Sequence, residues 1–204
     1  MKRLRLAALA VALSCAFPAA ADAPSPATDE QAESGIISRY LLMDANGRAV
    51  TDQDFPGRFQ LIAFGYTFCP DICPTTLAEM ALIVDKLGSL GERLQPLFVT
   101  VDPERDTPEV LRRYTGFFDA RIIGLSGSKE LVRRVADHFK VRFDKHLEPG
   151  AEPDKYSVDH SAGMYLLGPD GRFVAKFAYA TPHQEIAERI RTLMQEAKLR
   201  PPAK

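Results

Sequence analysis

Apolar positions along this chain follow two kinds of pattern, short continuous runs and helical repeats. The continuous runs Phe59–Phe64 and Leu97–Val101 have the length and composition of buried strands. Apolar residues at helical spacing predict helices over Thr75–Leu90, from Pro108 onward and over Lys129–Phe139. Because strands and helices alternate, we expect a mixed sheet with a parallel centre and helices on both faces.

Turn and cap signals mark the two ends of this region. Tyr40–Met43 followed by Asn46-Gly47 predicts an N-terminal β-hairpin. Met164–Leu167 and Arg172–Tyr179 predict a second hairpin, and Thr181-Pro182 opens a final helix as a hydroxyl cap followed by proline. This order, which ends on an antiparallel hairpin and a helix, predicts an α/β thioredoxin-like fold with a mixed central sheet flanked by helices.

The first 21 residues have the pattern of a secretory signal. Three basic residues precede an apolar run, small residues follow it, and we expect cleavage after Ala21. Two alternatives stay open. The uncharged run Leu6–Ala21 would serve as a retained anchor, although its 16 residues are short for a membrane span. Cys15 would be the lipidated residue of a bacterial lipoprotein signal, to which Ala12–Cys15 is an imperfect match.

The remaining chain divides into a linker, one domain and a short tail. Residues 22–34 are rich in Pro, Ala, Ser and acidic residues and predict a flexible linker, which leaves 35–199 as the domain and 200–204 as the tail. The formal net charge of −1 becomes more negative if the basic leader is removed. With no basic stripe we expect no nucleic-acid partner. The expected location is periplasmic or otherwise exported, with membrane attachment through the N-terminus left open.

Two cysteines lie where the first buried strand gives way to a helix. Cys69 and Cys73 are separated by three residues, so on a first helical turn they would share a face. A helix N-terminus favours the thiolate and is expected to lower a cysteine pKa. The two sulfurs would then bind one metal ion or form a strained, reducible disulfide. A structural disulfide closing so short a loop would stabilise little, and structural zinc needs a fourth ligand that the neighbourhood does not offer.

One of the four histidines stands out by its position. His160 precedes the strand Met164–Leu167, in a loop that a thioredoxin-like fold places opposite the cysteine turn. Two thiolates and an imidazole form a soft ligand set that suits Cu(I), and Cu(II) after oxidation. His138, His146 and His183 have no local partner pattern, and we expect no ligand role for them.

Four sequence blocks together carry a family resemblance. They are Gly65–Pro74 (GYTFCPDICP), Val101–Thr107 (VDPERDT), Leu125–Ser128 (LSGS), and Val158–Ser161 (VDHS) leading to Met164–Leu167 (MYLL). With these blocks the chain resembles the Sco/SenC family of copper chaperones over about residues 35–197. The CxxxC and DHS elements are the most specific, because generic thioredoxins have neither.

The resemblance implies a ligand set, a role and a partner. The family binds copper through two cysteines and a histidine, which correspond here to Cys69, Cys73 and His160. It acts in assembling the dinuclear copper centre of cytochrome c oxidase, by delivering copper, by reducing the receiving cysteines, or both. The partner would be the copper-bearing oxidase subunit or another copper chaperone. Many members are held by an uncleaved transmembrane helix, whereas this N-terminus has the pattern of a cleavable signal.

Two rival functions remain at this stage. A thiol–disulfide oxidoreductase would use Cys69 and Cys73 as its redox pair and would not need His160. A copper or redox sensor would use the same residues without delivering copper. A peroxidase is the weaker enzyme hypothesis, because no donors for a peroxide pocket are assignable.

Acidic residues near the candidate ligands also have two interpretations. Asp71 and Asp159 would either orient His160 and tune the thiolates or only cap loops. The segment Asp102–Asp106 follows a strand end, where it would form the rim of the site or meet a partner. Alternatively, Asp106 or Thr107 only caps the next helix.

Overall fold

The structure is a computed structural model that describes residues 35–199. The predicted signal (1–21), linker (22–34) and tail (200–204) lie outside the described residues. In chain order the elements are β1 (Leu41–Asp44), β2 (Ala49–Thr51), β3 (Phe59–Gly65), α2 (Ile72–Leu87), η1 (Gly88–Arg93), β4 (Leu94–Thr100), α3 (Pro108–Phe118), β5 (Ile123–Ser126), α4 (Lys129–His138), β6 (Phe143–Leu147), β7 (Tyr156–His160), β8 (Met164–Leu167), β9 (Phe173–Phe177) and α5 (His183–Leu199).

Seven strands form one mixed sheet, in the order β2-β1-β5-β4-β3-β8-β9. The central strands β5, β4 and β3 are parallel, and the strands at both edges pair antiparallel. All seven residues of β3 and of β4 are buried, as expected for strands covered on both faces. The predicted mixed sheet with a parallel centre and the N-terminal hairpin β1–β2 are confirmed.

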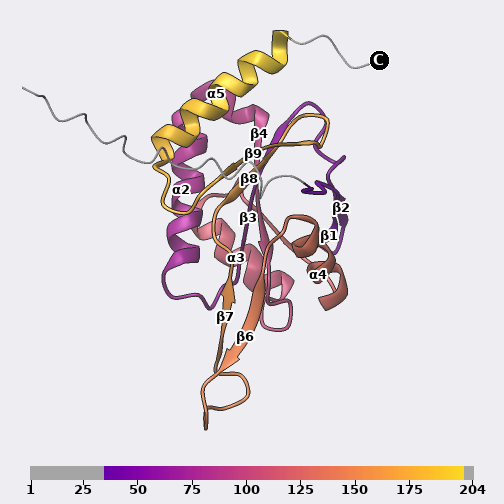
Figure 1. Ribbon diagram of the computed structural model, residues 1–204, viewed down its shortest axis with the longest axis vertical. Coiled ribbons are helices and arrows are strands. Elements are labelled where there is room, and N and C mark those ends of the chain that lie inside the picture. The colour runs from indigo at the N-terminus through magenta and orange to yellow at the C-terminus, as the bar shows by residue number, and fades with distance from the viewer. Residues whose placement is uncertain (1–34, 200–204) are drawn as a thin grey trace, which may run out of the picture.

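Helices cover both faces of the sheet (Figure 1). Neighbouring residues at the end of β3 point to opposite faces, as the pleat requires. Phe64 packs against Phe139, which follows α4, with ring centroids 5.5 Å apart, whereas Gly65 faces Cys73 of α2. Helices α3 and α5 both contact α2, and α4 contacts β1. The sheet is therefore enclosed between α4 on one side and the group of α2, α3 and α5 on the other.

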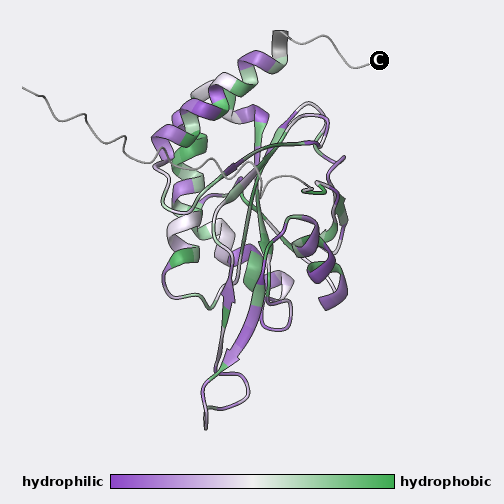
Figure 2. Ribbon diagram, viewed as in Figure 1, coloured by the Kyte–Doolittle hydropathy of each residue, from purple (hydrophilic) through white to green (hydrophobic). Residues whose placement is uncertain are grey.

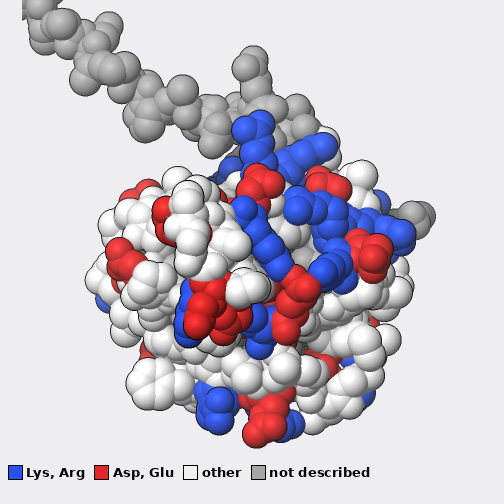
Figure 3. All heavy atoms as spheres, turned by 90° about the horizontal axis from the view of Figure 1, so that it is seen from below, with Lys and Arg blue, Asp and Glu red and all other residues white. Residues whose placement is uncertain are grey.

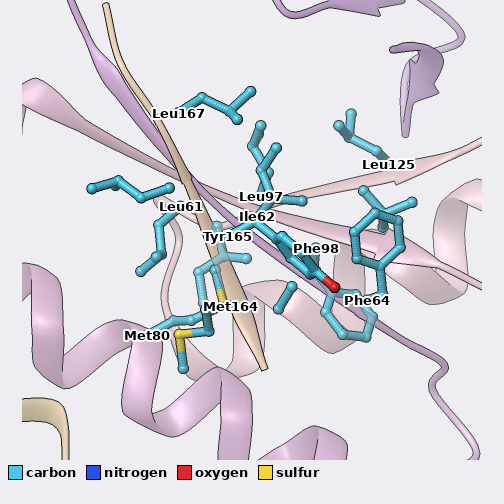
Figure 4. Close-up of a cluster of buried hydrophobic side chains, with 14 of the residues drawn as sticks. Leu61, Ile62, Phe64, Met80, Leu97, Phe98, Leu125, Met164, Tyr165 and Leu167 are labelled. Atoms are coloured by element: carbon cyan, nitrogen blue, oxygen red, sulfur yellow. The ribbon is translucent and has the colours of Figure 1, made fainter. Parts of the chain in front are cut away.

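The hydrophobic core lies along the central strands. Figure 2 shows hydrophobic residues concentrated in the sheet and hydrophilic residues on the outer helices and on the β6–β7 hairpin. Figure 4 shows side chains of β3, β4 and β8 meeting Met80 of α2. Leu61, Leu97 and Leu166 have no exposed surface. This packing makes the carboxyl end of β3 a rigid base for the residues that follow it.

The start of α3 was predicted correctly from local sequence signals, whereas the start of α2 was predicted too late. Thr107 caps α3, because its hydroxyl accepts from the Val110 amide at 3.3 Å with Pro108 at the first helical position, as predicted. Helix α2 begins at Ile72, three residues before the predicted start at Thr75, and ends at Leu87, after which Gly88 has φ 59°.

The main difference from the sequence-based expectation is the hairpin β6–β7. Sequence analysis predicts no strand between Phe139 and Met164, but β6 pairs antiparallel with β7 from Phe143–His160 to Leu147–Tyr156. His146 lies in β6, and His160 ends β7 rather than lying in a loop. This two-stranded sheet is separate from the central one and projects from the body (Figure 1).

Basic and acidic side chains are intermingled on the end from which the hairpin projects (Figure 3). Among residues 35–199, no helix has the length and apolar character needed to cross a membrane.

Candidate metal centre

The two cysteines lie on either side of the start of α2. Cys69 precedes the helix in a turn, where its amide donates to the Tyr66 carbonyl at 3.3 Å. Cys73 is inside the helix and is 1 % exposed, whereas Cys69 is partly exposed. Cys69 therefore lies outside the first helical turn, because Pro70 and Asp71 lead into the helix without belonging to it.

His160 reaches these sulfurs from the end of β7. Its Nε2 lies 3.4 Å from the Cys73 Sγ, and its Nδ1 lies 3.0 Å from the Ser161 carbonyl oxygen. If Nδ1 carries the proton and donates to that carbonyl, the lone pair of Nε2 faces the sulfur pair. The structure thus brings together the three residues that sequence analysis selected, across 87 positions of chain.

The three ligand atoms lie within 4.8 Å of one another. Metal–ligand bonds of about 2.0–2.3 Å place the ligands of a three-coordinate ion roughly 3.5–4 Å apart. A small inward movement of the side chains would therefore complete a coordination sphere. Within residues 35–199 this trio is the one cluster of three His, Cys, Asp or Glu side chains with metal-binding spacing.

Burial dominates the electrostatics of the site. It raises the pKa of the Cys73 thiol well above its ordinary value, and the neighbouring Cys69 adds to the shift, although a backbone hydrogen bond to Tyr66 opposes it. The expected lowering of a cysteine pKa by the helix N-terminus is therefore wrong for Cys73. Burial also lowers the pKa of His160, although the hydrogen bond to the Ser161 carbonyl and the charge of Asp159 act to raise it. The imidazole is therefore neutral at pH 7. A neutral imidazole is the form that binds metals.

The acidic residues divide between structural and peripheral positions. Asp71 precedes α2 without a side-chain capping bond, and the Asp159 side chain is exposed on β7. Asp106 is fully buried and caps no helix; it accepts from the Thr67 amide at 3.1 Å, from the Thr67 hydroxyl at 2.6 Å and from the Thr100 hydroxyl at 2.6 Å. Because Thr67 lies two residues before Cys69, these bonds fix the turn that carries the first cysteine.

The other three histidines lie outside this cluster. The Nδ1 of His138 lies 2.8 Å from the Arg39 carbonyl oxygen, and the Nε2 of His146 lies 3.1 Å from a Glu148 carboxylate oxygen. His183 Nδ1 lies 2.8 Å from a carboxylate oxygen of Glu79, in a pocket between α2 and α5.

Two residues near the site, Tyr66 and Arg105, were given no individual role from the sequence. Tyr66 follows β3, its hydroxyl accepts from the Val158 amide at 3.3 Å, and its ring stands edge-on to His160 with centroids 6.0 Å apart. Arg105 lies beside the rings of Tyr66, Phe68 and Tyr156. Both belong to blocks quoted for the family resemblance, which was the available signal, but their contacts depend on the tertiary fold.

Comparison with known proteins identifies the family. The SCO1/SenC family model matches residues 28–195. Protein sco1 of Schizosaccharomyces pombe is 39 % identical over 154 residues, which are 74 % of this chain and 58 % of that protein. Other curated relatives likewise extend well beyond the matched region, since the chain covers 52 % of the human SCO1 homolog.

Solved structures agree in fold. The structure of Arabidopsis thaliana ScoI with copper bound is 32 % identical, with a TM-score of 0.71 over 81 % of this chain and 99 % of that one. Bradyrhizobium japonicum ScoI with copper bound is 37 % identical, with a TM-score of 0.68 over 76 % and 96 %. The thioredoxin-like fold predicted from sequence is thereby confirmed, and the chain belongs to the SCO1/SenC family.

Proposed function

We propose that this chain is a copper metallochaperone that holds one Cu(I) ion through Cys69, Cys73 and His160. The observation that carries the proposal is the convergence of two sulfur atoms and one imidazole nitrogen within 4.8 Å. Soft thiolates favour Cu(I) over the harder divalent ions, and three ligands without a fourth disfavour structural zinc. Two family members with copper bound have the same fold.

The unequal burial of the ligands suits transfer to another protein. Cys73 is held beneath the surface, whereas Cys69 and His160 are partly exposed. An acceptor thiolate would approach from the exposed side and replace Cys69 or His160 as a ligand, leaving Cys73 as the last bond to break. The acceptor we propose is the copper-bearing subunit of cytochrome c oxidase, or another copper chaperone that serves its dinuclear centre.

A second function uses the same sulfur atoms as reductant. The thiolate of Cys69 would attack an oxidised cysteine pair of the acceptor, and Cys73 would then displace the acceptor sulfur. The products are a Cys69–Cys73 disulfide and a reduced acceptor pair, so two electrons and two protons pass to the acceptor. The partly exposed Cys69 beside a buried partner favours this role as a companion to copper delivery.

We also propose that the protein works outside the cytoplasm. Its basic N-terminal residues followed by an apolar run and Ala19–Ala21 support export through a secretory signal, to the periplasm in a bacterium. Mass spectrometry of the mature N-terminus distinguishes the forms. Cleavage after Ala21 gives a free soluble chain, lipidation places a modified Cys15 first, and a retained anchor leaves Met1 or Lys2 in place.

Anaerobic copper titration of the reduced protein tests the metal site. We expect one Cu(I) per chain, and X-ray absorption that counts two sulfur ligands and one nitrogen ligand. Substitution Cys69→Ala, Cys73→Ala or His160→Ala should each weaken binding sharply, whereas His138→Ala, whose ring lies outside the cluster, should not. Unchanged Cu(I) affinity in His160→Ala would overturn the three-ligand site.

Assembly of the oxidase in a His160→Ala strain separates the two roles. Copper delivery predicts loss of the dinuclear centre at low copper. Assembly that persists in this strain but fails with Cys69→Ala would favour cysteine reduction instead.

A further inference from the structure

The candidate ligand His160 sits on an element that is not part of the central sheet. It pairs with Phe143 at the base of the two-stranded β6–β7 sheet, whereas both cysteines follow β3 in the core. The distance between His160 and Cys73 therefore depends on whatever fixes the hairpin to the body. The Tyr66 hydroxyl does so at the Val158 amide, and Arg133 of α4 does so at the Phe143 carbonyl. Arg105 does so at the start of β7 and also reaches the cysteine turn.

Arg105 bridges the end of β4 and the start of β7. Its side chain is only 14 % exposed, and its Nε donates to the fully buried Asp102 carboxylate at 2.5 Å. Its Nη1 donates to the backbone carbonyls of Asp154 at 3.1 Å and Tyr156 at 2.9 Å. The Tyr156 hydroxyl donates to the other Asp102 oxygen at 2.7 Å, which closes a ring of hydrogen bonds around the first residue of β7.

The same guanidinium also contacts the cysteine turn. Its central carbon lies 3.6 Å from the ring centroid of Tyr156 on the hairpin. It also lies 4.7 Å from the ring centroid of Phe68, which precedes Cys69, and 5.7 Å from that of Tyr66. Arg105 therefore contacts both the cysteine turn and the hairpin that carries His160. It is not a metal ligand itself, because its guanidinium offers donors and no acceptor lone pair.

An arginine suits this place for a physical reason. Its planar group stacks on aromatic rings and donates in several fixed directions at once, which a lysine does not do. Charge-assisted hydrogen bonds of this kind are strong and directional. A further ion pair between hairpin and body, from Glu104 to Lys145, lies at the exposed surface and contributes little.

We propose that Arg105 is a positioning residue for the metal site, which sets the distance between His160 and the two cysteines by locking the β6–β7 hairpin to the cysteine turn. The inference rests on the proposed copper function. Arg105→Met should weaken Cu(I) affinity by about 10–100-fold, the usual cost of losing a residue that orients a ligand. Arg105→Lys should restore little of it, because charge alone does not replace the stacked fork.

A double-mutant cycle tests whether Arg105 acts through His160. In a His160→Ala background, Arg105→Met should change Cu(I) affinity by less than about twofold, because the ligand it positions is already gone. A general structural role would weaken binding equally in both backgrounds and would overturn the proposal. The matched control is Glu104→Gln, which removes the exposed ion pair between the same loop and Lys145 of the hairpin, together with the pair to Lys129 of α4, and should leave affinity unchanged.

Two further readouts keep the test decisive if Arg105→Met is poorly stable. Tyr156→Phe keeps the ring but removes the hydroxyl that shares Asp102, and should weaken copper binding in the same direction by a smaller factor. In Arg105→Met, X-ray absorption should retain two sulfur ligands and lose nitrogen, and the Val158 amide should exchange faster with solvent. Normal copper binding by His160→Ala would overturn the proposed three-ligand copper site. Weak binding by His160→Ala together with normal binding by Arg105→Met would overturn only the positioning role of Arg105.

Discussion

The absence of a side chain at Gly65 makes room for Cys73, and Gly65→Ala tests this packing. A Cβ at this position would lie 2.6 Å from the Cys73 Sγ and 2.9 Å from two atoms of the Phe98 ring. Non-bonded heavy atoms prefer separations of about 3.5 Å or more, so the sulfur would have to move by roughly 1 Å. Cys73 is 1 % exposed and Phe98 is 0 % exposed, so neither has open space to enter.

Two losses follow from this clash. Overpacking a rigid core costs about 1–3 kcal/mol, and we expect the free energy of unfolding of the metal-free protein to fall by that amount. A displacement of roughly 1 Å is a large fraction of a metal–sulfur bond of about 2.3 Å. We therefore expect Cu(I) affinity to fall by about 10–100-fold, as for other misplaced ligands.

Urea denaturation of the reduced, metal-free protein measures the first loss, and competition with a chromophoric Cu(I) chelator measures the second. Gly116→Ala is the matched control, because a Cβ there, in the exposed surface of α3, meets nothing within 4 Å. It should stabilise the protein by about 0.5–1 kcal/mol and leave copper binding unchanged. Wild-type stability together with wild-type copper affinity in Gly65→Ala would refute the packing argument.

Three other predictions concern protons and helix ends. Because burial raises the pKa of Cys73, its thiol is protonated at neutral pH in the metal-free protein, whereas His160, with a lowered pKa, is already neutral. Cu(I) binding should thus release a proton from Cys73, and Cu(I) affinity should rise about tenfold per pH unit for each proton released. Calorimetry in buffers of different ionisation enthalpy measures the proton release. An affinity that does not change with pH would contradict this prediction. Ser128→Ala should lower the free energy of unfolding by about 0.5–2 kcal/mol in urea melts, since Ser128 caps α4. Lys140→Gly should raise it by about 0.5–1 kcal/mol, because Lys140 has φ 58° after α4, and a lower value would show that its side chain stabilises the turn.

The parts of the fold that sequence analysis predicted are those with a strong local pattern. Strand β3 is buried throughout and apolar apart from Gln60, because both its faces are covered. Met164–Leu167 was predicted with the bounds that the structure has. The start of α3 was predicted from Thr107 because a cap bond involves residues three apart. Each of these signals is contained within a few neighbouring residues.

The β6–β7 hairpin had no such signal. Four of the five residues of β6 are exposed, so alternation between apolar and polar positions is weak. The hairpin is held by Arg105 and Tyr66, which lie about fifty and ninety residues away from their partners in β7. Local propensity does not report contacts of this range, and no strand was predicted in this segment.

The candidate site was predictable in its members but not in its chemistry. The two cysteines were selected from their position after a strand, and His160 gained weight from the family resemblance rather than from spacing. The direction of the Cys73 pKa shift was wrong because the helix N-terminus is a local effect, whereas burial beneath Gly65 and Phe98 is a tertiary one. Burial of a titratable group depends on which side chains fold over it, and a one-dimensional pattern does not contain that.

The three candidate ligands are fixed to the protein in three different ways, and this bears on how a cargo ion would be held and released. Cys73 lies on the buried face of helix α2, and Cys69 lies in a turn held through Thr67 and Asp106. His160 belongs to a hairpin outside the central sheet. A site with three equally rigid ligands would hold an ion well but would resist its transfer, because no ligand could move away from the ion without deforming the core. On the proposed function, the hairpin supplies the one ligand that can withdraw as a unit, and the Arg105 contacts set how much free energy that withdrawal costs. Changes at Arg105 should therefore alter the rate of copper transfer as well as copper affinity, whereas changes at Cys73 should abolish both.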